Sequence, residues 1–96
     1  DASELTPLID AARDRDVAVL AAVPRGGRSP FDVDLTRPVL VLVGGEGAGL
    51  GGEVAATADA TLSVPMRRPV DSLNAAVAVA LIVYEARRQR LASRRG

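Results

Sequence analysis

Apolar positions along the chain follow two spacings, one typical of helices and one typical of buried strands. Leu5, Leu8, Ile9 and Ala12 recur at helical spacing behind Ser3, a good N-cap residue, which predicts an amphipathic helix over residues 4–15. Continuous apolar runs at 17–23 and 39–43 are rich in Val and Leu, as in parallel strands that are buried on both faces. A short helix near 53–58 and a third strand at 60–64 are expected after them.

The last expected element is a long helix. Asp71 or Ser72 can cap it, and it continues through Ala92 without a helix breaker. Its middle is apolar all round, so in a short chain we expect it to pack against a partner subunit as well as its own sheet. The order helix, strand, loop, strand, helix, strand, helix predicts an α/β domain with a parallel sheet. The loop at 24–38 is longer than a simple connection requires, so it is either functional or mobile.

Composition excludes several kinds of chemistry. The 96 residues suffice for one small domain, and they contain no cysteine and no histidine. Disulfides, thiolate or histidine metal sites and Ser-His-Asp hydrolysis are therefore excluded, and no metal site is expected. All twelve basic residues are arginine, which also excludes a Walker-type phosphate loop and Schiff-base chemistry. The lack of cysteine, of a signal peptide and of a membrane span favours a cytoplasmic protein.

The zero net charge conceals an uneven distribution. Residues 1–59 carry five arginines against ten acids, whereas residues 60–96 carry seven arginines against two acids. Five of these arginines cluster near the C-terminus, at Arg87, Arg88, Arg90, Arg94 and Arg95. Such a cluster can bind phosphates, although cations at the end of a helix also suit the helix dipole.

Two loops follow expected strands and carry the candidate chemistry. Six of the nine residues at 44–52 are glycine, more than a turn between a strand and a helix needs, and bare backbone there could hold a ligand. The second loop covers 65–74. In open parallel sheets, ligands bind beyond the carboxyl ends of the strands, which is where both loops begin.

A dinucleotide site is one possible use of the first loop. Gly47, Gly49 and Gly52 satisfy the pattern G-x-G-x-x-G. The acidic residue expected at the end of the next strand is missing, because Val64, Pro65 and Met66 occupy that position, and the helix that follows the glycines is short. A dinucleotide-binding module therefore stays an alternative.

Taken together, the two loops resemble a known family. Residues 41–50 (VLVGGEGAGL), 62–66 (LSVPM) and 70–78 (VDSLNAAVA) are similar to the second and third motifs of the SpoU, or TrmH-like, branch of the SPOUT RNA methyltransferases. The resemblance spans residues 39 to about 88. It implies a trefoil-knotted α/β fold, S-adenosylmethionine as methyl donor, a homodimer, and methylation of a ribose 2′-hydroxyl in ribosomal or transfer RNA.

The resemblance also implies roles for particular residues. Those that would hold the cofactor, mostly through backbone, are Gly44, Gly45, Gly47, Leu62, Val64, Pro65, Met66, Leu73 and Asn74. The candidates for the reacting centre are Glu46, Ser72 and Asn74. Each of these three has a structural alternative, since an acid or a small polar residue also stabilises the start of a helix. Arg67 and Arg68 could add a phosphate contact to RNA near the site.

The family's first motif, N-x-G-x-x-x-R, has no counterpart in this sequence. The resemblance therefore implies that residues 1–96 are the C-terminal part of a single methyltransferase domain, which lacks the first strands and the arginine that helps to activate the ribose hydroxyl. A third alternative is a non-catalytic fragment, in which the apolar helix dimerises and the arginines hold RNA.

Overall fold

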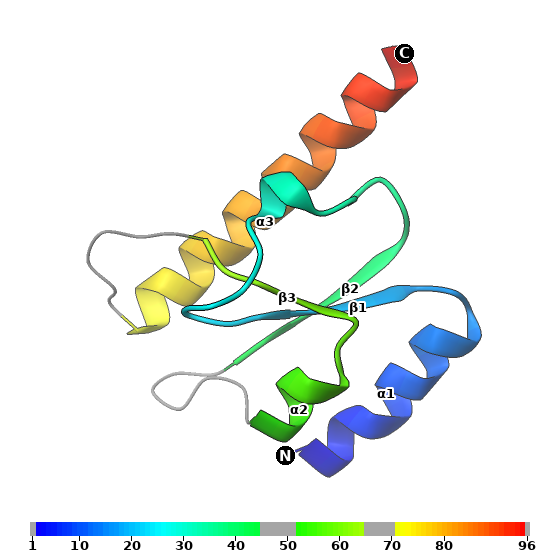
Figure 1. Ribbon diagram of the computed structural model, residues 1–96, viewed down its shortest axis with the longest axis vertical. Coiled ribbons are helices and arrows are strands. Elements are labelled where there is room, and N and C mark those ends of the chain that lie inside the picture. Colours follow the sequence, from blue (N-terminus) through cyan, green and yellow to red (C-terminus); the bar gives the residue numbers. More distant parts are fainter. Residues whose placement is uncertain (1, 45–51, 65–70, 96) are drawn as a thin grey trace.

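The computed structural model describes residues 2–44, 52–64 and 71–95 as an α/β domain with three layers (Figure 1). The elements are α1 (Ala2–Asp14), β1 (Ala18–Ala22), the 3-10 helix η1 (Pro30–Asp32), β2 (Val39–Val43), α2 (Gly52–Thr57), β3 (Ala60–Leu62) and α3 (Asp71–Arg95). The order of helices and strands predicted from the apolar pattern is confirmed.

The boundaries of several elements differ from the prediction. Helix α1 begins at Ala2, so Ser3 lies inside it, and the prediction that Ser3 caps the helix is wrong. A serine is tolerated in the first turn of a helix because the N–H groups there have no intrahelical acceptor. Asp71 and Ser72 likewise lie inside α3, in its first turn, so the prediction that one of them caps this helix is also wrong. β3 ends at Leu62, two residues earlier than predicted.

A Schellman motif ends α1 and leads directly into the sheet. Asp16 adopts a left-handed conformation with φ of 59°. The N–H of Asp16 donates to the carbonyl of Arg13 and that of Val17 donates to the carbonyl of Ala12, as this motif requires. Val17 packs against the same core cluster as Ala12, so the turn sets the direction in which β1 leaves the helix.

The sheet is parallel, with the strand order β2-β1-β3. β1 is the central strand and pairs with β2 through five residues, from Ala18 opposite Val39 to Ala22 opposite Val43. On its other side, Ala22 pairs with Leu62 of β3. Asp59 fixes this register, because its carboxylate accepts a hydrogen bond from the Val19 N–H (2.7 Å) and its own N–H donates to the Val19 carbonyl (2.7 Å).

Helices cover both faces of the sheet. On one face, α1 and α2 form a core cluster with Val19 and Leu42; on the other, α3 packs with Leu20 and Leu62. Successive residues of β1 and β2 thus point into opposite cores, which explains why these two strands are apolar throughout. Figure 1 shows α1 and α2 together below the sheet and α3 above it.

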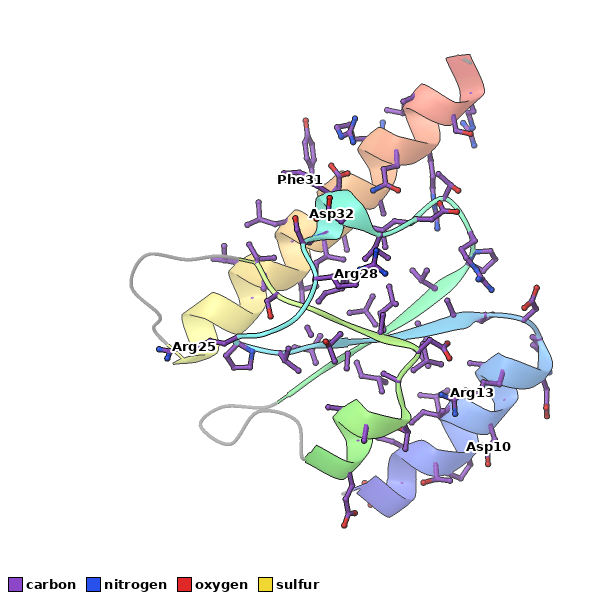
Figure 2. The ribbon with its side chains drawn as sticks, viewed as in Figure 1. Asp10, Arg13, Arg25, Arg28, Phe31 and Asp32 are labelled. Carbon is purple, nitrogen blue, oxygen red and sulfur yellow. The ribbon has the colours of Figure 1, made fainter. Side chains whose placement is uncertain are left out.

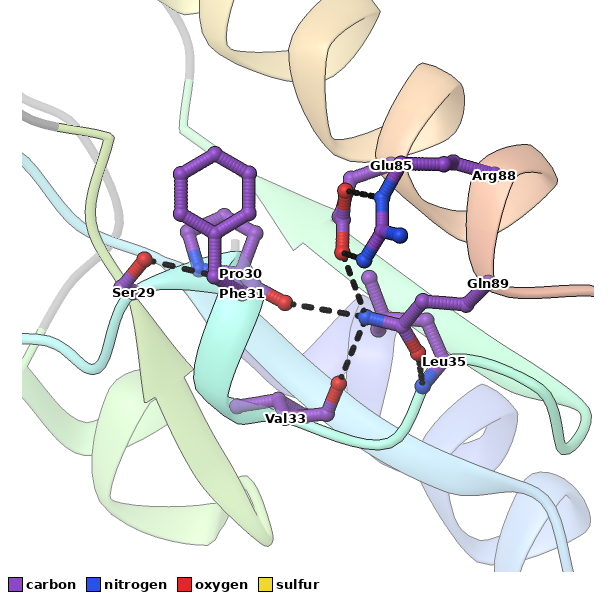
Figure 3. A network of polar contacts seen from close by, with 8 residues as sticks. All are labelled: Ser29, Pro30, Phe31, Val33, Leu35, Glu85, Arg88 and Gln89. Carbon is purple, nitrogen blue, oxygen red and sulfur yellow. Dashed lines mark hydrogen bonds and ion pairs between the residues drawn. The ribbon is translucent and has the colours of Figure 1, made fainter. Parts of the chain in front are cut away.

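The long loop between β1 and β2 is ordered by α3, so the alternative of a mobile loop is wrong. Leu35 in this loop is fully buried, and its N–H donates to the Gln89 side chain (2.7 Å). The Gln89 amide in turn donates to the carbonyls of Pro30 and Val33 (3.2 and 3.1 Å; Figure 3). One side chain of α3 thereby holds both ends of the turn that contains η1.

Helix α3 is only partly covered. Among residues 76–94 of this helix, Ile82 and Glu85 are buried, whereas Val77, Leu81, Val83, Tyr84 and Leu91 are exposed. The prediction that α3 packs on its own sheet is confirmed. The apolar residues on its outer side have no cover within the described part of the chain, and packing against a partner subunit stays a prediction.

Candidate functional site

The three strands end in register at one edge of the sheet. Ala22, the last residue of β1, lies opposite Val43 on one side and Leu62 on the other, and these are the last residues of β2 and β3. Neighbouring strands are about 4.8 Å apart, so the ends of β2 and β3 are roughly 10 Å from each other. The two loops predicted to hold a ligand therefore begin on either side of β1, within the width of a small molecule.

Three of the predicted cofactor residues are described at this edge. Gly44 directly follows β2 and is half-buried, and Val64 is half-buried beyond the end of β3. The side chain of Leu62 is inside the core at 1% exposure, so only its backbone faces the edge. Its carbonyl accepts a hydrogen bond from the Val23 N–H (2.8 Å). This agrees with a cradle formed mainly by backbone.

The other predicted residues are described only in part or not at all. Ser72, Leu73 and Asn74 lie in the first turn of α3, which Figure 1 shows in yellow on the side of the molecule where the strands end. Seven of the predicted site residues lie outside the described residues: Gly45, Glu46, Gly47, Pro65, Met66, Arg67 and Arg68. The structure therefore describes where the two family loops begin and where α3 starts, and the roles of these seven residues stay predictions.

A third loop at this edge was not assigned a role from the sequence. It follows β1 and so lies between the other two. Ser63 holds it in place: its hydroxyl donates to the Val23 carbonyl (2.8 Å) and accepts from the Gly27 N–H (2.9 Å). Gly27 approaches β3 so closely that a Cβ atom there would lie 2.6 Å from the carbonyl carbon of Leu62. The only sequence signal for this contact is the adjacent pair Gly26 and Gly27.

This third loop brings positive charge to the edge. Arg25 is exposed where the strands end, as Figure 2 shows, and it makes no hydrogen bond or ion pair with the residues that the structure describes. Arg28 is also exposed, but its guanidinium donates to the Asp32 carbonyl (2.8 Å), so it is turned along η1. Arg25 is therefore the free cation nearest this edge in the described part of the chain.

The described residues fit an adenosyl sulfonium better than a metal ion. Val43 is exposed and Val23 and Val64 are half-buried at the edge, which gives apolar surface beside glycine backbone, as a nucleoside requires. No group of three or more acidic, histidine or cysteine side chains that could hold a metal ion occurs among residues 2–44, 52–64 and 71–95. Within the same residues, no helix is long and apolar enough to cross a membrane.

The fold is that of an α/β domain with an open parallel sheet, a class in which ligands bind beyond the carboxyl ends of the strands. Comparison with known proteins gives the family. Residues 2–84 match the SpoU rRNA Methylase family, and the chain belongs to it. The six-residue α2 is too short for the long helix that follows a dinucleotide-binding glycine loop, so the fold does not favour that alternative.

Two curated relatives have named RNA substrates. The chain is 41% identical over 78 residues to the 23S rRNA (uridine(2479)-2'-O)-methyltransferase of Streptomyces viridochromogenes, covering 81% of the chain and 27% of that protein. It is 42% identical over 80 residues to the tRNA (guanosine(18)-2'-O)-methyltransferase of Thermus thermophilus, covering 82% of the chain and 41% of that protein. The chain thus spans less than half the length of either relative.

Solved structures confirm the fold. The SpoU methyltransferase AviRb from Streptomyces viridochromogenes, in complex with the cofactor AdoMet, aligns with a TM-score of 0.78 at 36% identity, over 96% of this chain and 37% of that one. The TrmH/SpoU tRNA modifying enzyme of A. aeolicus aligns with a TM-score of 0.76 at 31% identity, over 91% of this chain and 45% of that one. The predicted α/β methyltransferase fold is therefore confirmed.

Proposed function

We propose that this chain is the cofactor-binding, C-terminal part of an S-adenosylmethionine-dependent RNA 2′-O-ribose methyltransferase. The observation that carries the proposal is the common edge at which β1, β2 and β3 end, with the two family loops beginning roughly 10 Å apart on either side of β1. The names of the two relatives, both 2′-O-methyltransferases of RNA, and the AdoMet complex of AviRb support it.

Backbone is proposed to do most of the cofactor binding. Gly44, Gly45 and Gly47 form one wall, the strand end from Leu62 to Met66 forms the other, and Leu73 packs against the cofactor. When bound, S-adenosylmethionine supplies an electrophilic methyl group on a sulfonium. Carbonyl oxygens and apolar side chains suit this cation, because they place no competing positive charge beside the sulfur.

The polar residues are proposed to act on the ribose. The 2′-hydroxyl of the ribose would be the group that receives the methyl, and it would lose its proton to an acceptor. Asn74 and Ser72, in the first turn of α3, are assigned to hold the ribose hydroxyl in line, and Glu46 stands on the opposite loop. Arg67 and Arg68 are assigned to the adjacent phosphate. The activating arginine of the family's first motif belongs to a part of the domain outside these residues.

The proposal extends to the assembly. A homodimer through α3 would cover the exposed apolar residues Val77, Leu81, Tyr84 and Leu91. The trefoil knot and a cytoplasmic location, where ribosomal and transfer RNA are modified, belong to the same proposal.

Cofactor binding is tested first. The intact protein is titrated with S-adenosylhomocysteine in a calorimeter, and we expect saturable binding of one molecule per protomer. The absence of any heat with protein that is folded by circular dichroism would contradict the proposed function.

The site assignment is tested by Asn74→Ala in the intact protein. We expect RNA methylation, measured as tritium transferred from labelled S-adenosylmethionine, to fall by at least about 100-fold, the scale for losing one positioning group. Cofactor affinity should fall by less than about tenfold, because Asn74 would contact the cofactor mainly through backbone, and the dimer should be unchanged. Ala76→Ser is the matched control, since Ala76 is exposed on the same helix and has no proposed role. Normal turnover by Asn74→Ala would show that this assignment is wrong.

A further inference from the structure

A cleft lies far from the proposed methyl-transfer site. It is open, has a volume of about 430 Å³, and is lined by Thr36, Pro38, Arg90, Ser93 and Arg94. Pro38 directly precedes β2, whereas Gly44 directly follows it, so the cleft is at the amino edge of the sheet. Five strand residues span about 17 Å, which separates the cleft from the edge where the family loops begin. Figure 1 shows the segment before β2 beside the C-terminal half of α3.

Arg90 is held rigidly at this cleft. Its Nε donates to the Leu35 carbonyl (3.0 Å) and its Nη2 donates to the Arg37 carbonyl (3.1 Å). Leu35 itself is fully buried and its N–H is bonded to Gln89, so the carbonyl that accepts from the Arg90 Nε is held in place. Within the described residues, the Nη1 group of Arg90 has no hydrogen-bond partner. A guanidinium that is already oriented loses little entropy when it binds an anion.

Arg94 and Ser93 complete the donor set. Arg94 is exposed one turn beyond Arg90 and forms no hydrogen bond or ion pair with other described residues. No acid follows Glu85 in the sequence of α3, and Glu85 is paired with Arg88. Asp34, the acid nearest in sequence to the lining residue Thr36, accepts hydrogen bonds from the Thr36 N–H and hydroxyl and is not part of the lining. The cleft is therefore positive.

We propose that this cleft binds a backbone phosphate of the RNA substrate. Two guanidinium groups and a hydroxyl match the oxygens of a phosphodiester, and the absence of an aromatic ring from the lining argues for phosphate rather than base. The proposal rests on the proposed function, because that function makes RNA the substrate. Its consequence is a second contact about 17 Å from the methyl-transfer edge, which raises RNA affinity and leaves the chemistry unchanged.

The test is Arg94→Glu in the intact protein, with Arg87→Glu as the matched control. Both positions are exposed on α3, both changes reverse one charge, and only Arg94 lines the cleft. Binding of a fluorescein-labelled tRNA transcript is followed by anisotropy over a range of NaCl concentrations. For Arg94→Glu we expect at least about tenfold weaker binding and a salt slope smaller by about 1. For Arg87→Glu we expect less than about a threefold change. Ser93→Ala, which removes only the hydroxyl, should weaken binding by about threefold.

The outcomes separate this proposal from the proposed function. If Arg94→Glu and Arg87→Glu weaken tRNA binding equally, overall charge and not the cleft binds RNA, and the proposal is overturned. It is also overturned if Arg94→Glu does not weaken tRNA binding. Wild type and Arg94→Glu are also titrated with inorganic phosphate by calorimetry, which tests whether the ligand of the cleft is a free anion. If Arg94→Glu loses phosphate binding but keeps its tRNA affinity, the proposal that the cleft binds RNA is overturned. A different result would contradict the proposed function, namely wild-type protein that binds tRNA but does not bind S-adenosylhomocysteine.

Discussion

Glu85 is the buried acid of this fold, and its partners lie on the same helix. It is 4% exposed, and among the described residues it is the one charged or polar residue that is buried. Arg88 donates to both of its oxygens (2.8 and 2.9 Å), and Gln89 donates to one of them (2.8 Å; Figure 3). The hydrogen bonds from Arg88 and then Gln89 lower the pKa of Glu85 from 4.5 to about 2.

This lowered pKa predicts how stability depends on pH. The unfolded chain takes up the Glu85 proton near pH 4.5, whereas the folded chain stays ionised until about pH 2. The stabilisation from Glu85 is therefore complete above about pH 5 and is lost as the pH falls toward 2. In urea unfolding, we expect wild type to be more stable than Glu85→Gln at pH 7, with the difference shrinking at pH 3. Glu53→Gln, at an exposed position of α2, is the control. A difference that is the same at both pH values would contradict the role of this carboxylate.

Gly27 is a position where only hydrogen fits. A Cβ atom there would lie within 2.8 Å of three atoms of Leu62 and Ser63, two of them backbone. We expect Gly27→Ala to lower the free energy of unfolding by about 1–3 kcal/mol, as overpacking does. Gly52→Ala is the matched control, because a Cβ at Gly52 meets nothing within 4 Å, and it should be neutral or slightly stabilising in the same urea titration. Equal stability of the two variants would show that the contact relaxes at no cost.

Both residues show the limit of sequence reasoning at this scale. The paired glycines at 26 and 27 stand out in the sequence, but Gly27 contacts the end of β3 and the following Ser63, which is 36 residues away. Glu85 ends an apolar run in a helix, and from the sequence alone it is no different from a surface acid. Its burial depends on Gln89 and on the loop that Gln89 holds.

At the scale of elements, local patterns predict strands and helices but not how a loop packs. The runs at 39–43 and 75–84 are continuous and apolar, so their burial or helical form follows from the residues themselves. The loop at 24–38 has no such pattern. Its order comes from long-range hydrogen bonds, and those made by the Gln89 side chain join residues 54 to 59 positions apart.

Gln89→Leu tests this interaction between α3 and the loop. The change removes the acceptor of the buried Leu35 N–H and the donor to two loop carbonyls. We expect the free energy of unfolding to fall by about 1–3 kcal/mol, the usual cost of an unsatisfied buried group. Hydrogen exchange at the Leu35 amide should become faster. Arg87→Leu, at an exposed position on the same helix, is the control and should leave this amide protected. Unchanged exchange in Gln89→Leu would mean that packing of Leu35 alone orders the loop.

At the scale of the whole molecule, strand order decides what the site contains. The sequence predicts that two loops leave the carboxyl edge, and this follows from the strands being parallel. The sequence does not predict the strand order β2-β1-β3, because the order of strands along the chain does not determine which strands are neighbours in the sheet. That order places the β1 loop, with Arg25, between the two family loops. Glu46, Met66, Arg67 and Arg68 lie outside the described residues, so their roles rest on the sequence alone.

The prediction of a homodimer rests on the outer face of α3. Val77, Leu81, Tyr84 and Leu91 recur at helical spacing and are exposed, although residues of this kind are usually covered. A second copy of the chain packed on this face would bury them, and because the same surface would then occur on both protomers, one substitution would alter the interface twice.

Leu81→Asp uses this symmetry to test the dimer. Leu81 is 46% exposed, so an aspartate is tolerated in a single protomer, but two unpaired carboxylates in a dry interface are costly. We expect the dissociation constant, measured by analytical ultracentrifugation of the intact protein, to rise by at least about 100-fold, which corresponds to about 2.8 kcal/mol. Leu8→Asp is the matched control: Leu8 is 49% exposed, but it lies on α1, across the sheet from α3, so this variant should remain a dimer. If Leu81→Asp also remains a dimer, α3 does not form the interface, and its exposed apolar residues must be covered by another part of the intact protein.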